Sequence, residues 1–496
     1  MSGLDVNRRE FLKITAGAGA ALAVPGVGVG AATQKMIGIQ VGAISFVDEG
    51  TEKVLDVLQE RACVNTLFLA VFTYGRGIAG RQIPGQPLPD HGKQEYDLNF
   101  HGGNFATPHA QYYANTVLKE TRAPDHGNLD ILAEVIPAAK KRGMKVICWL
   151  EDVFREDVPN VQKAQERDLY GRNAETMCVN NPEYRNFLTG LVEDYARSYD
   201  IDGIMWGSER QGALCDSLGA THDDPPIDPG RVTCFCEFCK AKAKERGINP
   251  ERARQGFLEL EKYVRAARSG KRPVDGYYVQ FWRLLLRYPE LAAWEMLWTD
   301  SLRETYAAIY GTVKTAKPAV PVGWHIWHNN SFNPIYRAEQ DLQELSKYSD
   351  FLKIVMYNNC GGERMALYVD NIGSTLFGDL SKQSLLDFDY AVMNYKGEGT
   401  YAQIPHTGLS PDYVFRETKR ALAGVEGTKT LIWPGIDIDI PTEPDHSKCS
   451  RASVKAAVTA ALHAGAPGVL LSRKYSEMRL DDLSGAGDAV RELGVG

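Results

Sequence analysis

Short apolar runs alternate with amphipathic segments along most of the chain, from about residue 36 to the C-terminus. Runs of strand length, each followed by a loop and a segment of helical periodicity, predict parallel strands buried on both faces. The predicted strands span residues 36–46, 65–74, 145–150, 203–206, 321–328, 351–357, 430–436 and 468–472. Eight such units close a (β/α)₈ barrel, so the sequence predicts a TIM barrel. The alternative is an open doubly wound sheet, but residues 42–45 (Gly-Ala-Ile-Ser) are not its Gly-rich phosphate turn.

The regions between the predicted strands differ in length and character. Helices are expected at 51–61, 128–142, 183–199, 339–347 and 451–464, and between 277 and 317. A long Gly/Pro/His-rich loop follows the second strand, and a polar, Cys-containing helical insertion at about 207–276 follows the fourth. The stretch around 388–395 is less regular. We therefore expect one barrel domain over residues 33–496, carrying these two elaborations.

The N-terminus has the pattern of an export signal. Arg8 and Arg9 are followed by Phe-Leu-Lys, then by a weakly apolar stretch over 14–30 and by small residues at Ala31 and Ala32. This pattern predicts a twin-arginine signal peptide over residues 1–32. A membrane anchor is the alternative, but the apolar stretch is short and contains Pro25. We expect the twin-arginine translocase as a partner, a periplasmic or extracellular location, and no membrane association after processing.

Composition narrows the class of partner. The net charge of −7 comes without a long basic run, which argues against nucleic acid or an anionic membrane as a partner. No motif for an organic cofactor is recognised. The nine cysteines are an odd number, which excludes a complete disulfide framework.

Polar and aromatic residues gather where the predicted strands end, which is the catalytic edge of a TIM barrel. Aromatic rings can lie against the C–H face of a sugar while carboxylates and amides bind its hydroxyls, so this set predicts a carbohydrate site. The predicted substrate-binding residues are Tyr74, Trp149, Glu151, Asp152, Trp206, Arg210, His325, His328, Asn329, Tyr357, Asn358 and Trp433.

Glycoside hydrolysis needs two carboxyl groups beside the scissile bond. Glu209, directly after the fourth strand, is the predicted acid/base, with a loop salt bridge to Arg210 as the bland alternative. Asp437 and Asp439 follow the seventh strand, which lies opposite the fourth in a barrel, and are the predicted partner carboxylates. Glu151 and Asp152 are the rival pair.

Closely spaced cysteines follow the fourth strand. Cys234, Cys236 and Cys239 offer three of the four thiolates that a tetrahedral zinc ion needs. Cys215 is the predicted fourth ligand because it is near in sequence, with Cys178 or His222 behind it. A structural zinc is therefore expected, and a disulfide or buried thiols are the alternatives.

A family resemblance rests on three segments. They are residues 180–185 (Asn-Asn-Pro-Glu-Tyr-Arg), 199–204 (Tyr-Asp-Ile-Asp-Gly-Ile) and 234–239 (Cys-Phe-Cys-Glu-Phe-Cys). This block, over about residues 130–247, resembles bacterial glycoside-hydrolase-like barrel proteins and, distantly, family 42 β-galactosidases. The resemblance implies a barrel, sugar chemistry and a zinc held by the three cysteines and one more. The chain departs from that family in having Ser208 where an Asn precedes the acid/base, and Asp437 and Asp439 where a Glu nucleophile stands.

Three functions remain open from the sequence. The leading hypothesis is a glycoside hydrolase using carboxylate acid/base catalysis. A metal-dependent sugar isomerase or epimerase could draw on Glu151, Glu209, His325 and Glu477 as ligands. A carbohydrate-binding barrel without catalysis is the third, because a Glu after the seventh strand is absent.

Overall fold

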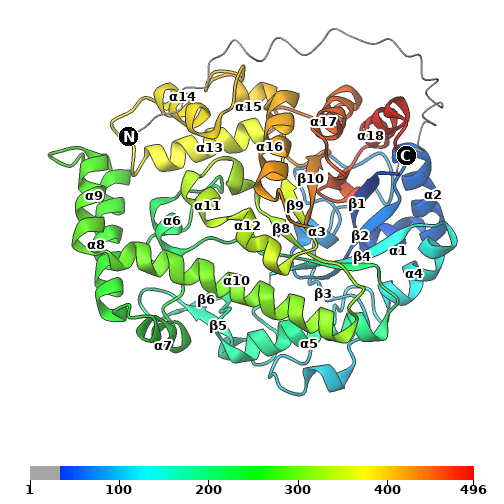
Figure 1. The fold of residues 1–496 in the computed structure, drawn as a ribbon, viewed down its shortest axis with the longest axis horizontal. Helices are drawn as coiled ribbons and strands as arrows, with labels where there is room; N and C mark the ends of the chain where they lie inside the picture. The colour runs from blue at the N-terminus through cyan, green and yellow to red at the C-terminus, as the bar shows by residue number, and fades with distance from the viewer. Residues whose placement is uncertain (1–33, 153) are drawn as a thin grey trace, which may run out of the picture.

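Eight parallel strands close into a barrel in a computed structural model that describes residues 34–152 and 154–496 (Figure 1). The pairing runs β1, β2, β4, β7, β8, β9, β10, β11 and back to β1. The barrel strands are β1 (Met36–Gly42), β2 (Thr66–Thr73), β4 (Lys145–Glu151), β7 (Gly203–Gly207), β8 (Val322–Ile326), β9 (Phe351–Val355), β10 (Leu431–Asp437) and β11 (Gly468–Ser472). The short β3 (Gly103–Asn104) pairs antiparallel with β2, and β5 (Gln165–Arg167) and β6 (Asn173–Met177) form a separate ribbon. The predicted (β/α)₈ barrel is confirmed.

Helices surround the barrel, and the connections differ greatly in length (Figure 1). The first half carries α1 (Ala43–Glu49), α2 (Thr51–Ala62), α3 (Arg76–Ala79), α4 (Ile131–Lys141) and α5 (Pro182–Ser198). Between β7 and β8 lie α6 (Ala213–Leu218), α7 (Glu237–Glu245), α8 (Pro250–Arg268), α9 (Tyr277–Arg287) and α10 (Glu290–Ala316). The second half carries α11 (Pro334–Glu339), α12 (Leu342–Leu345), α13 (Gly361–Gly373), α14 (Lys382–Met393), α15 (Ile404–Thr407), α16 (Pro411–Gly424), α17 (Arg451–His463) and α18 (Leu480–Leu493). None of these described helices combines the length and apolar composition that a bilayer crossing needs.

The predicted elements differ from the structure at some of their boundaries. The first strand ends at Gly42 and α1 follows at once, because this apolar run continues as a helix rather than as a longer strand. The helices expected between 277 and 317 are α9 and α10, separated at Pro289, which lacks the N–H that a continuous helix would use. The irregular stretch around 388–395 belongs to α14, which ends at Asn394 in the left-handed conformation.

Local sequence explains where α5 begins, and this helix supports the region before β7. Asn181 precedes the helix and its side chain accepts a hydrogen bond from the Glu183 N–H. Pro182 occupies the first helical position, where no N–H partner is needed. The Asn-Pro-Glu run in the resemblance block is therefore a helix start.

The barrel interior changes from aromatic to polar toward the carboxyl ends of its strands. Phe351 stacks on Trp433 with ring centroids 4.1 Å apart, and Phe68 meets Trp433 edge-on at 5.8 Å. Gly323 makes room for this layer, since a Cβ there would lie 2.3 Å from the Phe351 ring. One strand layer further on stand His325 and Lys353, which are paired in the ladder between β8 and β9. An apolar floor therefore supports a buried polar layer.

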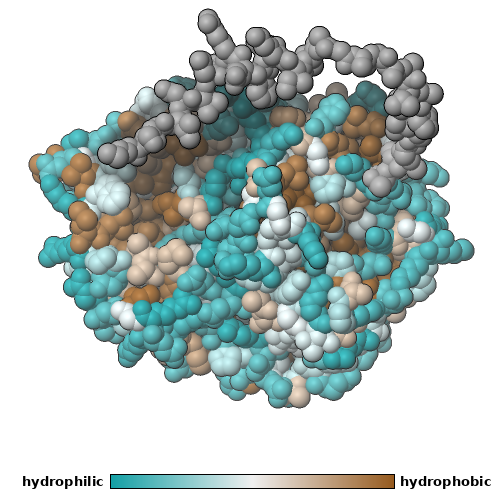
Figure 2. Space-filling view, viewed as in Figure 1, coloured by the Kyte–Doolittle hydropathy of each residue, from teal (hydrophilic) through white to brown (hydrophobic). Residues whose placement is uncertain are grey.

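Apolar side chains are also exposed on the insertion between β7 and β8. Figure 2 shows apolar residues gathered over the edge of this face where α9 lies. Val274 is 95% exposed and Leu286 on α9 is 78% exposed. These side chains belong to the insertion rather than to the barrel wall.

Candidate active site

A cleft opens beyond the carboxyl ends of the strands, where a TIM barrel carries its chemistry. It encloses about 730 Å³, including the solvent at its mouth. Its lining comes from several connections: Glu209 after β7, His222, Asp223 and Asp224 after α6, Trp327 after β8, Glu363 and Arg364 on α13, Pro441 after β10 and Arg473 after β11. Carboxylates, guanidinium groups and one indole ring therefore face a common space.

Glu209 ends a chain of hydrogen bonds that leads down into the barrel. Its Oε1 lies 2.9 Å from Nε2 of His325, and Nδ1 of His325 lies 3.0 Å from Nζ of Lys353. Lys353 also donates to the Tyr357 hydroxyl at 2.9 Å. Because the ionised Glu209 carboxylate can only accept, Nε2 of His325 carries the hydrogen given to Glu209, and Nδ1 accepts from Lys353. The buried layer thus orients one carboxylate whose side chain is 48% exposed.

The surroundings of Glu209 favour its ionised form. Withdrawal from bulk water raises its pKa, but the hydrogen bond from His325, the charge that His325 carries in acid, and the charges of Arg364 and Lys353 outweigh this and lower the pKa to about 2. Burial, with the neighbouring Lys353, lowers the pKa of His325 to about 4, so its imidazole is neutral at pH 7. Burial also lowers the pKa of Lys353 to about 7. Glu209 is an anion held by a neutral donor.

Two other carboxyl groups near Glu209 are shifted the opposite way. Burial and the charge of Glu209 raise the pKa of Glu151 well above its ordinary value. Glu151 lies beneath the cleft beside Gly207, where a Cβ would come within 3.4 Å of its Oε2. Asp223 is exposed on the wall of the cleft, where desolvation and the charge of Glu209 raise its pKa against the hydrogen bond it accepts from the Thr221 hydroxyl at 2.8 Å. Carboxyl groups with opposed pKa shifts in one site are the pattern of an acid and a base.

His328, in its neutral form, holds the guanidinium group of Arg364 in the cleft. Nη1 of Arg364 donates to Nδ1 of His328 at 3.1 Å, and Nε2 of His328 donates to the Tyr413 hydroxyl at 3.1 Å. Burial and the Arg364 charge lower the pKa of His328 well below its ordinary value. Because the imidazole is uncharged, the positive charge of Arg364 remains available to a ligand.

The predicted partner carboxylates after β10 hold loops instead of lining this cleft. Asp437 is fully buried and accepts from the N–H groups of Asn358, Asn359 and Cys360, at 3.0, 3.3 and 2.9 Å. Asp439 accepts from the Arg479 N–H at 2.7 Å and from its guanidinium. Both carboxylates are therefore committed to neighbouring backbone and arginine groups.

The predicted substrate-binding residues divide into three groups. His325, His328, Tyr357 and Glu151 lie beneath or behind the cleft and act on the groups that line it. Asp152 and Arg210 form a buried ion pair, joined by Glu166, Tyr184 and Ser208. The others are buried or held by hydrogen bonds and ring contacts within the fold: Tyr74, Trp149, Trp206, Asn329, Asn358 and Trp433.

Two of the tryptophans lie on the outside of the barrel. Trp206 and Trp324 are neighbours in the ladder between β7 and β8, and both are fully buried. Tyr306 of α10 stacks on Trp324 at 4.4 Å and meets Trp206 edge-on at 5.4 Å. They fasten α10 to the barrel, and Trp327 is the tryptophan that lines the cleft.

Four buried cysteines converge away from the cleft. Sγ of Cys178 lies 3.5 Å from Sγ of Cys236 and 3.6 Å from Sγ of Cys239, and Cys234 completes the group. Zinc with Zn–S bonds of about 2.3 Å sets its sulfurs about 3.8 Å apart, so the four thiols fit the ion. Asn180 donates to Sγ of Cys239 at 3.3 Å, an outer contact typical of a metal site. Cys215, the predicted fourth ligand, is not in this group; it lies with Glu295 and Glu339.

Chain topology explains the position of Cys178. It follows β6 directly, and the cysteine segment joins β5 of the same ribbon through the Phe235 N–H and the Arg167 carbonyl, 2.8 Å apart. The ribbon thus brings together cysteines that are far apart in the sequence. Nearness along the chain, which favoured Cys215, was the wrong guide.

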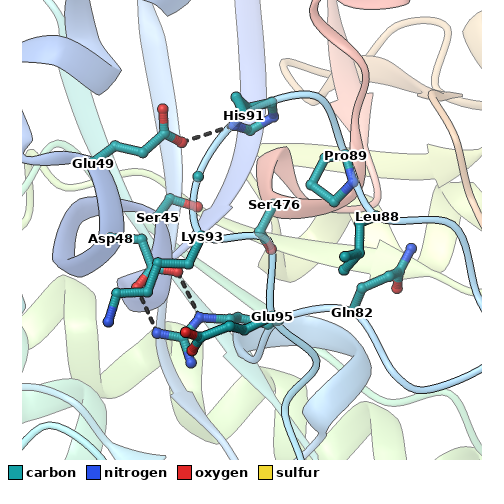
Figure 3. Close-up of a pocket in the computed structure, with 12 residues that line it drawn as sticks. Ser45, Asp48, Glu49, Gln82, Leu88, Pro89, His91, Lys93, Glu95 and Ser476 are labelled. Carbon is teal, nitrogen blue, oxygen red and sulfur yellow. Dashed lines mark hydrogen bonds and ion pairs between the residues drawn. The ribbon is translucent and has the colours of Figure 1, made fainter.

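A second hollow lies between α1 and the loop that follows α3 (Figure 3). Nδ1 of His91 lies 2.7 Å from Oε1 of Glu49, and the guanidinium of Arg81 donates twice to Asp48 at 2.6 Å. These charged groups are satisfied by one another. These contacts anchor the long loop that was predicted after the second strand.

Comparison with known protein families identifies the export signal. The twin-arginine translocation pathway signal sequence family matches residues 5–25, which confirms export by that pathway. The signal lies outside the described residues, so its structure is not described. No curated protein matches the chain.

Solved structures similar to this chain include glycoside hydrolases. α-L-Fucosidase isoenzyme 2 from Paenibacillus thiaminolyticus matches with a TM-score of 0.50 and 12% identity, over 93% of this chain and 49% of that one. The glycoside hydrolase domain of PgaB (BpsB) from Bordetella bronchiseptica matches at 0.49 and 12%, over 93% and 98%. A β-galactosidase from the haloarchaeon Halorubrum lacusprofundi matches at 0.48 and 16%, over 89% and 55%. The chain spans about half the length of the fucosidase. The expected resemblance to glycoside-hydrolase barrels is confirmed for the fold.

Proposed function

We propose that this protein is a glycoside hydrolase whose chemistry is carried by Glu209 and Asp223 in the cleft above the barrel. The observation that carries the proposal is that both carboxyl groups line one cleft while their pKa values shift in opposite directions. Glu209, ionised, serves as the base or nucleophile, and Asp223, with its raised pKa, protonates the leaving oxygen. This exchanges the role first expected for Glu209 and replaces Asp437 and Asp439 as its partner.

The remaining cleft residues suit a sugar. Trp327 offers an indole face for the C–H side of a pyranose ring. Arg364 and Arg473 offer guanidinium donors to hydroxyl or acidic groups of the substrate. His325 positions Glu209 through its hydrogen bond, and Lys353 fixes the tautomer of His325.

The isomerase alternative has less support. Two of its possible ligands, Glu209 and His325, are hydrogen-bonded to each other, and a third, Glu477, is paired with Arg473. Among the described residues, the groups whose ligand atoms converge contain neither glutamate. A carbohydrate-binding barrel without turnover stays the alternative that the assay below separates from the hydrolase.

The test is hydrolysis of a panel of α- and β-linked glycosides by the mature protein, beside Glu209→Gln and Asp439→Asn. We expect turnover on at least one substrate, lost by roughly a hundredfold or more in Glu209→Gln, as for removal of an acid/base group. Asp439→Asn should keep turnover, because Asp439 binds Arg479 rather than lining the cleft. Binding of oligosaccharide without turnover by the wild type would instead identify a binding protein.

We propose as well that Cys178, Cys234, Cys236 and Cys239 hold a structural zinc. The support is the buried cluster of four thiols at separations that suit the ion. With four protein ligands, zinc would tie the β5–β6 ribbon to α7 and activate no water.

A further inference from the structure

A second group of metal-ligating side chains stands at the rim of the cleft. His406 on α15 lies with Asp445 and His446 from the connection between β10 and α17. One ligand atom from each lies within 4.8 Å of the others. The two histidine rings meet edge to face, with centroids 5.3 Å apart. Two imidazoles and a carboxylate therefore converge from two elements.

Each histidine has its Nδ1 near an oxygen atom, but only His406 makes a hydrogen bond there. Nδ1 of His406 lies 2.9 Å from the carbonyl oxygen of Asp445, and Nδ1 of His446 lies 3.3 Å from Oε2 of Glu363. In His406 the carbonyl acceptor on Nδ1 fixes the tautomer and leaves Nε2 with a free lone pair for a cation. In His446 no hydrogen bond engages Nδ1, and the carboxylate of Glu363 adds negative charge beside this ring.

The connection that carries Asp445 and His446 is shaped before any ligand arrives. Nζ of Lys448 donates to the carbonyl oxygens of Thr442 and Glu443, at 3.0 and 2.6 Å. The Ser447 N–H donates to the carbonyl oxygen of Pro405 at 2.8 Å, which docks this connection on α15. Ordering the ligands therefore costs little when a cation binds.

We propose that His406, Asp445 and His446 form a binding site for a divalent transition cation such as Zn²⁺. Imidazole nitrogens suit zinc and its neighbours, whereas Ca²⁺ and Mg²⁺ prefer all-oxygen sites. Three protein ligands leave a position for water. The cation would join the connection after β10 to α15, and the pair between His446 and Glu363 extends this link to α13. Glu363 and Pro441 line the cleft, so the link fixes one of its walls.

The experiment uses the mature protein with its cysteine cluster intact. Co²⁺ replaces Zn²⁺ as a spectroscopic probe, because thiolate ligands give intense charge-transfer bands that imidazole and carboxylate ligands do not. Zinc content is measured in parallel after equilibration with Zn²⁺. The variants are His406→Ala and Glu363→Ala, and the control is His101→Ala, which changes an exposed histidine paired with Asp125. Circular dichroism of the metal-free variants checks that each one folds.

We expect the wild type and His101→Ala to bind one Co²⁺ beyond the thiolate site, with weak visible bands. His406→Ala should lose that equivalent or bind it at least about a hundredfold more weakly, because one of three ligands is gone, and Glu363→Ala should bind it more weakly, because a neighbouring negative charge is removed. The thiolate bands should be unchanged in all variants. Equal Co²⁺ binding by the wild type and a folded His406→Ala, or no Co²⁺ beyond the thiolate site in the wild type, would overturn the proposal. Neither result depends on glycosidase activity.

Discussion

Glu209 is set apart from the other strand-end carboxylates by the bond it accepts. His325 donates a hydrogen bond to Glu209. In contrast, Asp152 is paired with Arg210, and Asp437 accepts hydrogen bonds from three backbone N–H groups. Sequence position alone placed all of them at the catalytic edge. Which of them faces the cleft depends on partners that come from distant elements.

The pH dependence of catalysis should report the bond between His325 and Glu209. The pKa of Glu209 is lowered to about 2, so its required anion persists through the acidic range and is lost only as the pH falls through that value. In His325→Phe the donor is gone, and the pKa rises toward the ordinary value of 4.5. We expect the acidic limb of kcat/KM to move to higher pH by one to two units. An unmoved limb in a folded variant would show that another group titrates there.

At the scale of elements, the strands follow from sequence because apolar runs of strand length are local signals. The pairing of Trp206 with Trp324 was not predictable, since strand alternation does not tell which face turns outward until Tyr306 of α10 covers it. The sequence analysis did not select Asp223 because it lies in a loop after α6, far along the sequence from the end of β7. Cys178 was ranked second because it lies 58 residues before Cys236.

The cysteine cluster yields a matched pair of variants. Cys178→Ser should remove the bound zinc and loosen the β5–β6 ribbon, because a serine hydroxyl is a poor ligand beside three thiolates. Cys215→Ser changes a cysteine that is also buried but belongs to another group, and it should keep the zinc. Metal content and limited proteolysis of the purified variants would show this. Zinc retained by Cys178→Ser and lost by Cys215→Ser would restore the assignment made from sequence spacing.

For the whole molecule, the twin-arginine signal implies that the barrel folds before the protein is exported. Twin-arginine transport carries folded proteins, so the barrel and its cysteine cluster can form, and take up metal, before export. Replacing Arg8 and Arg9 together by lysine keeps the positive charge but removes the guanidinium pair of the signal. We expect the full-length precursor to accumulate inside the cell, measured by fractionation and immunoblotting. Undiminished export of this variant would mean that another route carries the protein.

In the proposed reaction Asp223 protonates the leaving oxygen while Glu209 acts as an anion in the same cleft. The most direct measurement is kcat/KM of the wild type and Asp223→Asn on aryl glycosides whose leaving groups span a range of phenol pKa values. A variant without its general acid should lose roughly a hundredfold or more on poor leaving groups and little on good ones, which depart unprotonated. An equal loss on every substrate, or no loss at all, would contradict the assignment of Asp223 and the account built on it.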